Sequence, residues 1–436
     1  MRGALSATLD RFFDLPAEPT VEADLAQHYR HNFVVNVLDL SAWLFGASFV
    51  SVNAILPVYA THLTASPFII GLIPALNDAG WFLPQIFLAP HVERLPHKLP
   101  LVRLLGFLER VPYFILPLGV LWLNGLTRHW AIVVFIVLMA WKSVGSGIVA
   151  IPWQELMAKI IPVVRRGRFF GAGNFLGQSL GIAGAAIAAA LLGWLPYPYN
   201  FAACFGAGAL GIGASWLFMS RTKEPPTTLA PASEQQYTGR LLDILKCDAN
   251  FRAYLLCRWL WYLGSMATGF MAVYAVQRFG LSDATAALYT GILYAAGVVG
   301  YAFWGPLGDR LGNKRTMVAS STLWLLALVA ALLSRAPWGF YLVFTLMGFG
   351  SAGGLIADQN IAMEFGPVAE RPTYMGLMRT STGPALLIAP LLGGWIAQEW
   401  SYPVLFGVSL SLAAIGLALL EWGVKDPRHL PKQAAQ

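Results

Sequence analysis

The stretch GPLGDRLGNK at residues 305–314 lies between two long apolar segments, residues 284–304 and 317–333. Its glycines permit a tight reversal of the chain, because glycine adopts positive φ at little steric cost. Its basic residues favour the anionic inner surface of a membrane. The stretch therefore predicts a short cytoplasmic turn between two membrane-spanning helices.

Three segments of the first half of the chain recur in the second half. The aligned segments are 90–98 with 306–314, 151–171 with 356–376, and 223–225 with 425–427. The aligned charged residues are Glu93 with Asp309, Arg94 with Arg310, and Arg166 with Arg371. A parallel repeat of this kind is typical of transporters whose substrate site lies at the interface of the two halves.

The composition is that of a chain surrounded by lipid. Of the 436 residues, 57% are hydrophobic and only 12% are charged, and the mean hydropathy is +0.60. Soluble domains carry about 25% charged residues, so a soluble, disordered or coiled-coil protein is excluded. In a membrane protein the excess of basic residues behind the net charge of +7 reflects the orientation of the chain in the bilayer, so no nucleic-acid partner is expected. The three cysteines lack paired spacing, so neither a disulfide framework nor a metal site is indicated.

Apolar windows of about 19 residues predict twelve spans. They are residues 33–59, 67–89, 101–123, 130–151, 169–192, 200–218, 251–276, 284–304, 317–333, 337–358, 374–397 and 402–422. The predicted fold class is an all-α integral membrane protein with twelve transmembrane helices in two pseudo-symmetric six-helix bundles. The predicted domains are a cytoplasmic tail (1–32), the first bundle (33–219), a cytoplasmic linker (220–250), the second bundle (251–423) and a cytoplasmic tail (424–436).

Most of the 29 Lys and Arg residues lie on one side of the membrane in this arrangement, in the segments that share a side with the N-terminus. Cytoplasmic segments are enriched in Lys and Arg. We therefore expect a multi-pass protein of the cell membrane with both termini in the cytoplasm.

Polar residues inside the first two spans predict a cavity wall. Asp39 shares one helical face with Asn36, Trp43 and Asn53, and the second span carries Asn77 beside Asp78. A charge within a span costs at least about 2.5 kcal/mol unless it is paired or faces water. Interhelical hydrogen bonds are an equally simple account of the asparagines.

Three further charges lie near mid-depth of the third and fourth spans: Glu109, Arg110 and Lys142. We expect Glu109 to pair with Lys142, either as a structural ion pair or as a substrate or proton site. In the seventh span, Arg258 and Tyr262 predict a cavity wall for an anionic or aromatic group. The alternative is that Arg258 extends to the cytoplasmic surface.

The repeated charges predict a cytoplasmic gate. Its six residues are Glu93, Arg94, Arg166, Asp309, Arg310 and Arg371. Pairs between the two halves would hold the cytoplasmic ends together when that side is closed. The alternative is that these residues are topological anchors only.

The stretch at 305–314 closely resembles the cytoplasmic loop motif of the major facilitator superfamily, with Asn313 in place of an Arg. The copy that ends at Lys98 is degraded. The resemblance covers the chain after residue 30, and Asn32-Phe33 with Asp39 is similar to an uncharacterised bacterial branch of the superfamily. It implies the twelve-helix fold and secondary transport. Residues 181–185 lack the superfamily's antiporter Gly-Pro, and Trp141 stands where its fourth-span motif has an Arg, which argues against drug/proton antiport.

The sequence thus predicts a secondary active transporter that moves a small organic solute by alternating access. If protons drive it, the titrating group is Asp39 or Glu109. We expect a monomer among membrane lipids, with no cofactor. The seven His residues lie in tails or loops, so an enzyme is not expected. A transporter-like receptor or assembly factor that binds without translocating stays open.

Overall fold

A computed structural model describes residues 23–93, 95–123, 125, 127–225, 244–362, 364–366 and 371–429. This part of the chain contains helices and no strand, which confirms the all-α class. The tail residues 1–22, the linker residues 226–243 and the last residues 430–436 lie outside it. The predicted division into domains stays a prediction.

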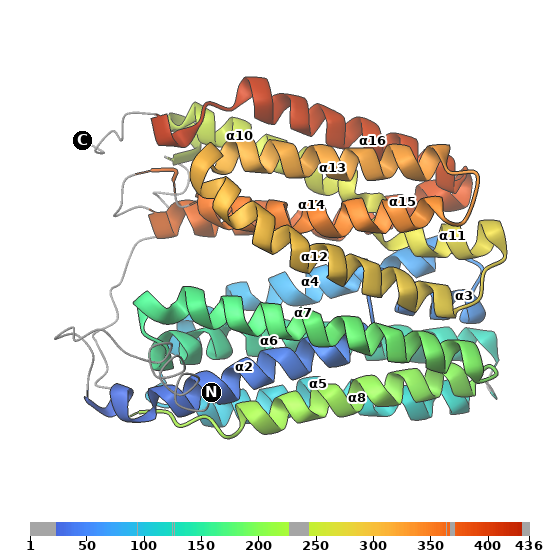
Figure 1. The fold of residues 1–436 in the computed structure, drawn as a ribbon, viewed down its shortest axis with the longest axis horizontal. Coiled ribbons are helices and arrows are strands. Elements are labelled where there is room, and N and C mark those ends of the chain that lie inside the picture. The colour runs from blue at the N-terminus through green and yellow to red at the C-terminus, as the bar shows by residue number, and fades with distance from the viewer. Residues whose placement is uncertain are drawn as a thin grey trace, which may run out of the picture.

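Each predicted span overlaps a helix or a broken pair of helices (Figure 1). The first half contains α2 (Ala23–Ser48), α3 (Ile55–Leu63), α4 (Pro67–Glu93), α5 (Leu99–Leu123), α6 (Arg128–Ile160), α7 (Val163–Trp194) and α8 (Tyr199–Met219). The second half contains α10 (Ala249–Gly264), η1 (Ser265–Phe270), α11 (Met271–Phe279), α12 (Ala284–Leu311), α13 (Asn313–Leu333), α14 (Gly339–Ala362), α15 (Arg371–Glu399) and α16 (Tyr402–Ala418). The short segments η3 (Leu419–Gly423) and η4 (Pro427–His429) follow.

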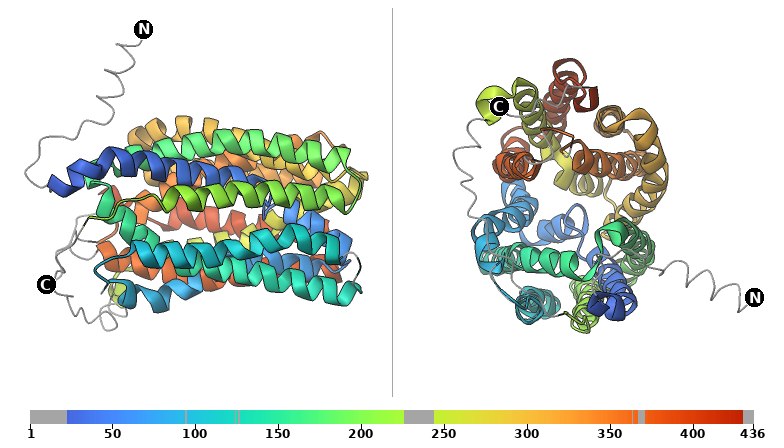
Figure 2. Two further views of the ribbon diagram at one scale, coloured as in Figure 1. Left: turned by 90° about the horizontal axis from the view of Figure 1, so that it is seen from below. Right: turned by 90° about the vertical axis from the view of Figure 1, so that its left-hand side faces the viewer.

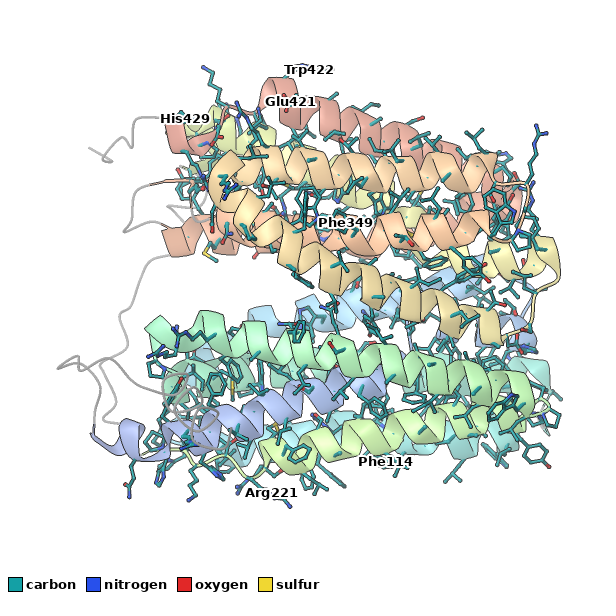
Figure 3. The ribbon with its side chains drawn as sticks, viewed as in Figure 1. Phe114, Arg221, Phe349, Glu421, Trp422 and His429 are labelled. Carbon is teal, nitrogen blue, oxygen red and sulfur yellow. The ribbon has the colours of Figure 1, made fainter. Side chains whose placement is uncertain are left out.

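The outer surface of the bundle is apolar. Nine of the described helices are long and apolar enough to cross a membrane, namely α5 to α8 and α12 to α16. Large hydrophobic side chains such as Phe114 and Trp422 are exposed on it (Figure 3). A surface of this kind is suited to lipid.

The first and seventh spans are broken at corresponding positions. Residues 49–54 separate α2 from α3, and the 3₁₀ segment η1 separates α10 from α11. The apolar windows did not indicate these breaks, because a hydropathy window registers side chains and not backbone geometry. Asn53 therefore lies in the break and not on the helical face that carries Asp39.

The described residues of the two halves share a core towards one end of the molecule. The chain enters α2 and α10 and leaves α8 and α16 at what we call the linker end, and the opposite end is the distal end (Figures 1 and 2). One large hydrophobic cluster contains residues of both halves, including Tyr59 and Phe270. Towards the linker end each half has its own cluster, around Phe33 in the first half and Phe251 in the second.

Small residues let helices of different halves approach closely. A Cβ added to Gly181 of α7 would lie 2.9 Å from the ring of Tyr294 in α12. A Cβ added to Gly291 would lie 3.3 Å from Ala185. Helices α7 and α12 therefore form one of the contacts between the halves.

The repeat is preserved at the linker end as a pair of identical clasps. The Asn32 side chain donates to the Lys223 carbonyl (2.8 Å) and accepts from the Lys223 amide (2.9 Å). Asn250 makes the same two bonds with Lys425, at 2.9 and 2.7 Å. In each half the clasp ties the first helix to the segment after the last one.

The reversal in the stretch at 305–314 is confined to one residue. Helix α12 continues through Pro306 to Leu311, and Gly312 alone has positive φ, at 94°. Asp309 and Arg310 therefore lie on the exposed last turn of α12 and not in a loop. The predicted turn is correct in place and shorter than expected.

Candidate functional site

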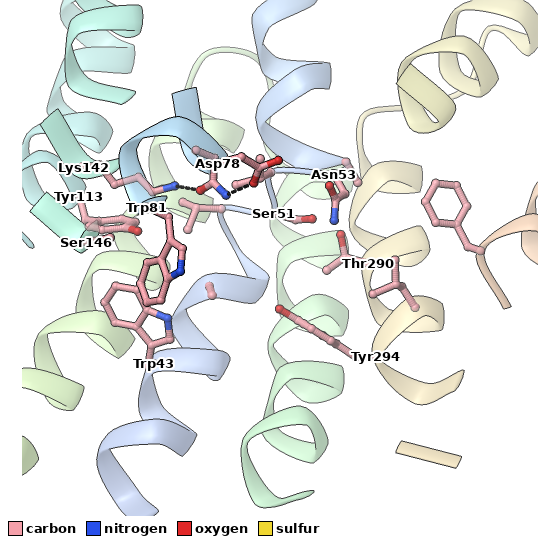
Figure 4. Close-up of a pocket in the computed structure, with 17 residues that line it drawn as sticks. Trp43, Ser51, Asn53, Asp78, Trp81, Tyr113, Lys142, Ser146, Thr290 and Tyr294 are labelled. Atoms are coloured by element: carbon pink, nitrogen blue, oxygen red, sulfur yellow. Dashed lines mark hydrogen bonds between the residues drawn. The ribbon is translucent and has the colours of Figure 1, made fainter. Parts of the chain in front are cut away.

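A pocket of about 430 Å³ lies at the boundary of the two halves (Figure 4). Its walls come from α2, α4, α5 and α6 of the first half, from the break after α2, and from α12 and α14 of the second half. The lining residues are Trp43, Ala47, Val50, Ser51, Val52, Asn53, Ala54, Asn77, Asp78, Trp81, Tyr113, Lys142, Ser146, Thr290, Leu293, Tyr294 and Phe344. Ligand pockets in proteins have volumes of about 300–1,000 Å³, so this one suits a small solute.

One hydrogen-bonded row of side chains carries the charge of the pocket. The Lys142 ammonium donates to Asn77 Oδ1 (3.0 Å), and Asn77 Nδ2 donates to Asp78 Oδ1 (3.3 Å). Figure 4 shows the row crossing from α6 to α4. A single neutral amide thus stands between an acid and a base.

Aromatic rings form the wall beside this row. The Trp43 and Tyr113 rings meet edge to face at 6.0 Å, and the Lys142 ammonium lies 5.9 Å from the centre of the Tyr113 ring. Trp81 lies next to Trp43 in Figure 4. Such a wall binds the flat face of an apolar group and also stabilises a nearby cation.

The opposite wall is hydroxyl-bearing and apolar. The break after α2 contributes Ser51 and Asn53, and the second half contributes Thr290, Tyr294 and Phe344. The break after α2 thus places Ser51 and Asn53 at the pocket.

A buried polar chain leads from the pocket into the first half. Ser146 Oγ donates to Glu109 Oε1 (2.5 Å), and Glu109 Oε2 pairs with Arg110 at 3.1 Å. Arg110 donates to Ser215 Oγ (3.0 Å), which donates to Asp39 Oδ1 (2.6 Å). The chain joins four helices, α6, α5, α8 and α2.

Glu109 and Lys142, which were expected to pair with each other, have different hydrogen-bond partners in the structure. Glu109 is bound by Arg110 and Ser146, whereas Lys142 is bound to Asn77. Adjacent residues on α5 are able to pair because the long Arg110 side chain folds back along the helix and also donates to the Gly106 carbonyl at 2.8 Å.

Arg258 lies in a separate group within the second half. It forms an ion pair with Asp358 and donates to the Tyr262 hydroxyl at 2.8 Å. Its guanidinium lies 5.0 Å from the centre of the Tyr262 ring. Arg258 is buried at 4% exposure, so it does not extend to the surface.

Five of the eleven predicted cavity residues line the pocket: Trp43, Asn53, Asn77, Asp78 and Lys142. Asp39, Glu109 and Arg110 belong to the buried chain behind it. Arg258 and Tyr262 lie in the group just described, and Asn36 is bound to Thr222 at 3.0 Å near the linker end. The assignment of Asp39 and Arg258 to a substrate cavity stays a prediction.

The predicted gate residues lie at the linker end. Arg166 donates to the Ala158 carbonyl at 2.8 Å within its own half, and Asp309 and Arg310 are exposed. Arg94 lies outside the described residues. Glu93 and Arg371 lie at helix ends, on α4 and α15, and their side chains are outside the described part. The gate stays a prediction.

Sequence reasoning did not single out several lining residues. Tyr113 and Ser146 lie four residues after Glu109 and Lys142, and Tyr294 lies four residues after Thr290. Because residues four apart share a helical face, following each intramembrane charge by one turn would have found the first two. Ser215 carries no such signal.

The halves also touch through polar groups near the distal end. His62 of α3 lies 3.1 Å from Asp283, which precedes α12, and its ring stacks on Tyr197 at 4.6 Å. Ser66 donates to Gln398 at 2.5 Å. Burial raises the pKa of the Tyr197 hydroxyl above its usual value, and the nearby Asp283 carboxylate adds to this effect.

Known proteins are similar to parts of this sequence and to its fold. The sequence model of the Major Facilitator Superfamily matches residues 254–436. An uncharacterised MFS-type transporter of Mycobacterium tuberculosis is 28% identical over 116 residues, which is 26% of this chain and 17% of that protein. The staphyloferrin B transporter of Staphylococcus aureus is 26% identical over 193 residues, 42% of this chain and 45% of that one. The matches thus span less than half of these relatives.

The fold resembles a solved transporter over nearly its full length. The structure of a D-xylose-proton symporter aligns with 91% of this chain and with 98% of its own chain, with a TM-score of 0.67 at 15% sequence identity. Together with the sequence matches, this bears out the resemblance to the Major Facilitator Superfamily noted at residues 305–314.

Proposed function

We propose that the protein is a secondary active transporter that moves a small organic solute by alternating access, and that the pocket between the halves is its substrate site. One observation carries this proposal: the pocket takes its walls from both halves, which share a core towards the distal end and have separate cores at the linker end. Rocking of one half against the other would expose such a site to each side in turn.

Proton coupling would use the buried chain behind the pocket. Asp39 and Glu109 are the acids of that chain, and Ser146 connects it to the pocket. A proton that binds to either acid would weaken its bond to Arg110 or Ser215. The chain thereby offers a physical link between protonation and the shape of the pocket, with Asp39 as the principal titrating group.

Closure of the linker end would use the gate residues. We place the linker end in the cytoplasm, in accord with the excess of Lys and Arg on that side, and the protein in the cell membrane as a monomer. Glu93, Arg94, Asp309 and Arg310 then form pairs across the halves together with Arg166 and Arg371. His62 and Asp283 hold the distal end closed.

Counterflow in proteoliposomes tests transport against the alternative of a transporter-like receptor. Liposomes preloaded with unlabelled solute should accumulate the labelled solute if the protein exchanges it across the membrane. A receptor binds the solute with no accumulation. A collapsed pH gradient should slow net uptake, and uptake that ignores the gradient would contradict proton coupling.

A further inference from the structure

We infer that the pocket selects zwitterionic α-amino acids with an aromatic or large apolar side chain. The inference rests on the proposed function only in taking this pocket as the substrate site. It follows from three features: the row of Lys142, Asn77 and Asp78, the charge balance of the lining, and the aromatic wall.

The Asn77 amide fills the position between Lys142 and Asp78 that the charged groups of a zwitterionic ligand would take. Its oxygen accepts a hydrogen bond from Lys142, and its nitrogen donates to Asp78. In a ligand, a carboxylate would take the position of that oxygen and an ammonium group the position of that nitrogen. An α-amino acid carries these two groups on one carbon, so it presents an acceptor and a donor side by side as the amide does.

The lining favours a ligand without net charge. Among the described residues that line the pocket, Asp78 and Lys142 are the charged ones, and their charges cancel. A simple cation would meet Lys142, and a simple anion would meet Asp78. Like charges in contact select against the wrong ligand, so the pocket discriminates against both kinds of single ion.

Neutral polyols leave the row unused. A sugar binds through hydroxyl groups, and the row already satisfies its own hydrogen bonds with Asn77. The bonds of Asn77 to Lys142 and to Asp78 each have one ionised partner already. A ligand with both charges adds the attraction of opposite charges at each end of the row, whereas a hydroxyl group only replaces what the amide provides.

The remaining lining determines the side chain of the ligand. Trp43, Trp81 and Tyr113 form a wall next to the row, and Leu293 and Phe344 lie on the side of the second half. These surfaces suit a flat apolar group that lies beside the row. Phenylalanine has this combination of features.

Binding to the full-length protein in nanodiscs at pH 7 tests the inference with matched probes. L-Phenylalanine is compared with phenethylamine, which lacks the carboxylate, with 3-phenylpropionate, which lacks the ammonium group, and with L-alanine, which lacks the ring. We expect each of the three analogues to bind at least tenfold more weakly than phenylalanine. A single ion that binds as tightly as phenylalanine, or no binding by any probe, would overturn the inference.

Two substitutions assign the groups. Lys142→Met should remove the preference for phenylalanine over phenethylamine, and Asp78→Asn should remove the preference over 3-phenylpropionate. Lys246→Met, at an exposed site before α10, is the matched control and should bind as the wild type does. Size-exclusion profiles establish that each variant is folded. Preferences that both variants retain would overturn the inference.

The outcome is separable from that of the proposed function. Phenylalanine that binds with this preference but is not exchanged in counterflow supports the inference and contradicts transport. Transport of another solute that phenylalanine does not compete with supports the proposed function and overturns the inference.

Discussion

The two halves have the same frame and different interiors. Each half is clasped at the linker end by an asparagine, Asn32 or Asn250, bound to the backbone of a lysine. In the first half, five polar residues form a buried chain across four helices. In the second half, the buried arginine pairs with one acid that is 23% exposed.

The two halves contribute different kinds of side chain to the pocket. Each clasp ties the first helix of its half to the segment after the last one, which is what the proposed rocking of the halves would require. The charges differ because the pocket is lined by an acid and a base from the first half and by hydroxyl and apolar groups from the second. The first half therefore carries the charge chemistry, and the second half supplies a wall.

The largest expected effect separates the two arginines. Arg110→Met removes the one cation bound to Glu109 and leaves two acids of the chain buried, so we expect a loss of about 3–5 kcal/mol in the free energy of unfolding. Arg258→Met should cost about 1 kcal/mol, because water reaches Asp358. Thermal unfolding in detergent measures both.

A second substitution serves as the control for the buried chain. Glu109→Gln in the Arg110→Met background removes the stranded charge and should recover part of the loss. Equal losses from the two arginine variants would contradict the asymmetry between the halves.

The two clasps should differ in how much they stabilise the fold, because Asn32 is more deeply buried than Asn250. Asn32 is 1% exposed, so Asn32→Ala strands the Lys223 backbone groups and should cost about 1–3 kcal/mol. Asn250 is only half-buried, and water replaces its bonds in Asn250→Ala, so the cost there should be smaller. Melting temperatures of the two variants provide the comparison, and a larger loss for Asn250→Ala would contradict it.

A third effect depends on pH and belongs to the first half. Glu224 accepts bonds from the backbone amides of Lys98 and Leu99 and pairs with Lys159 at 2.8 Å. Burial raises the pKa of the Glu224 carboxyl, but these bonds outweigh burial and hold it below the usual 4.5. Its stabilisation is therefore present above pH 4.5 and is lost as pH falls through the lowered pKa.

Glu224→Gln tests this sign. The variant should unfold about 1–2 kcal/mol more easily than the wild type at pH 7. The difference should shrink as pH falls below 4.5, where the wild-type carboxyl also becomes neutral. A difference that is constant from pH 7 to pH 3.5 would show that Glu224 acts by shape and not by charge.

The positions of the long helices were predictable from the sequence, but the breaks in the first and seventh spans were not. Each apolar window overlaps a helix in the described part of the chain, because a bilayer imposes length and apolarity on each span. The break at residues 49–54 escaped notice because FVSVNA contains neither Gly nor Pro. The helices also extend beyond the predicted spans, as in α2, which begins at Ala23. Hydropathy therefore indicates which residues lie within the bilayer, but it does not indicate where a helix begins or ends.

The charges of the candidate site were predictable for a related reason, and their partners were not. Asp78 and Lys142 stand out because a charge in an apolar span is rare. Ser146 and Ser215 connect the chain, but serine is common in such helices and usually bonds to its own backbone. Which serine turns to a carboxylate depends on helix packing, which the sequence pattern does not contain.

The smallest expected effect concerns the two ends of the molecule. His62→Ala removes a partly exposed contact between the halves at the distal end, and Asp309→Asn weakens the proposed gate at the linker end. Each contact is worth about 0–1 kcal/mol, so each variant should shift a two-state population by no more than about fivefold, and in opposite directions. His62→Ala favours the state open at the distal end, and Asp309→Asn favours the state open at the linker end. Spin labels at the linker ends of α4 and α12 should report shorter distances for the first variant and longer distances for the second. Unchanged distances in Asp309→Asn would leave that residue as a topological anchor.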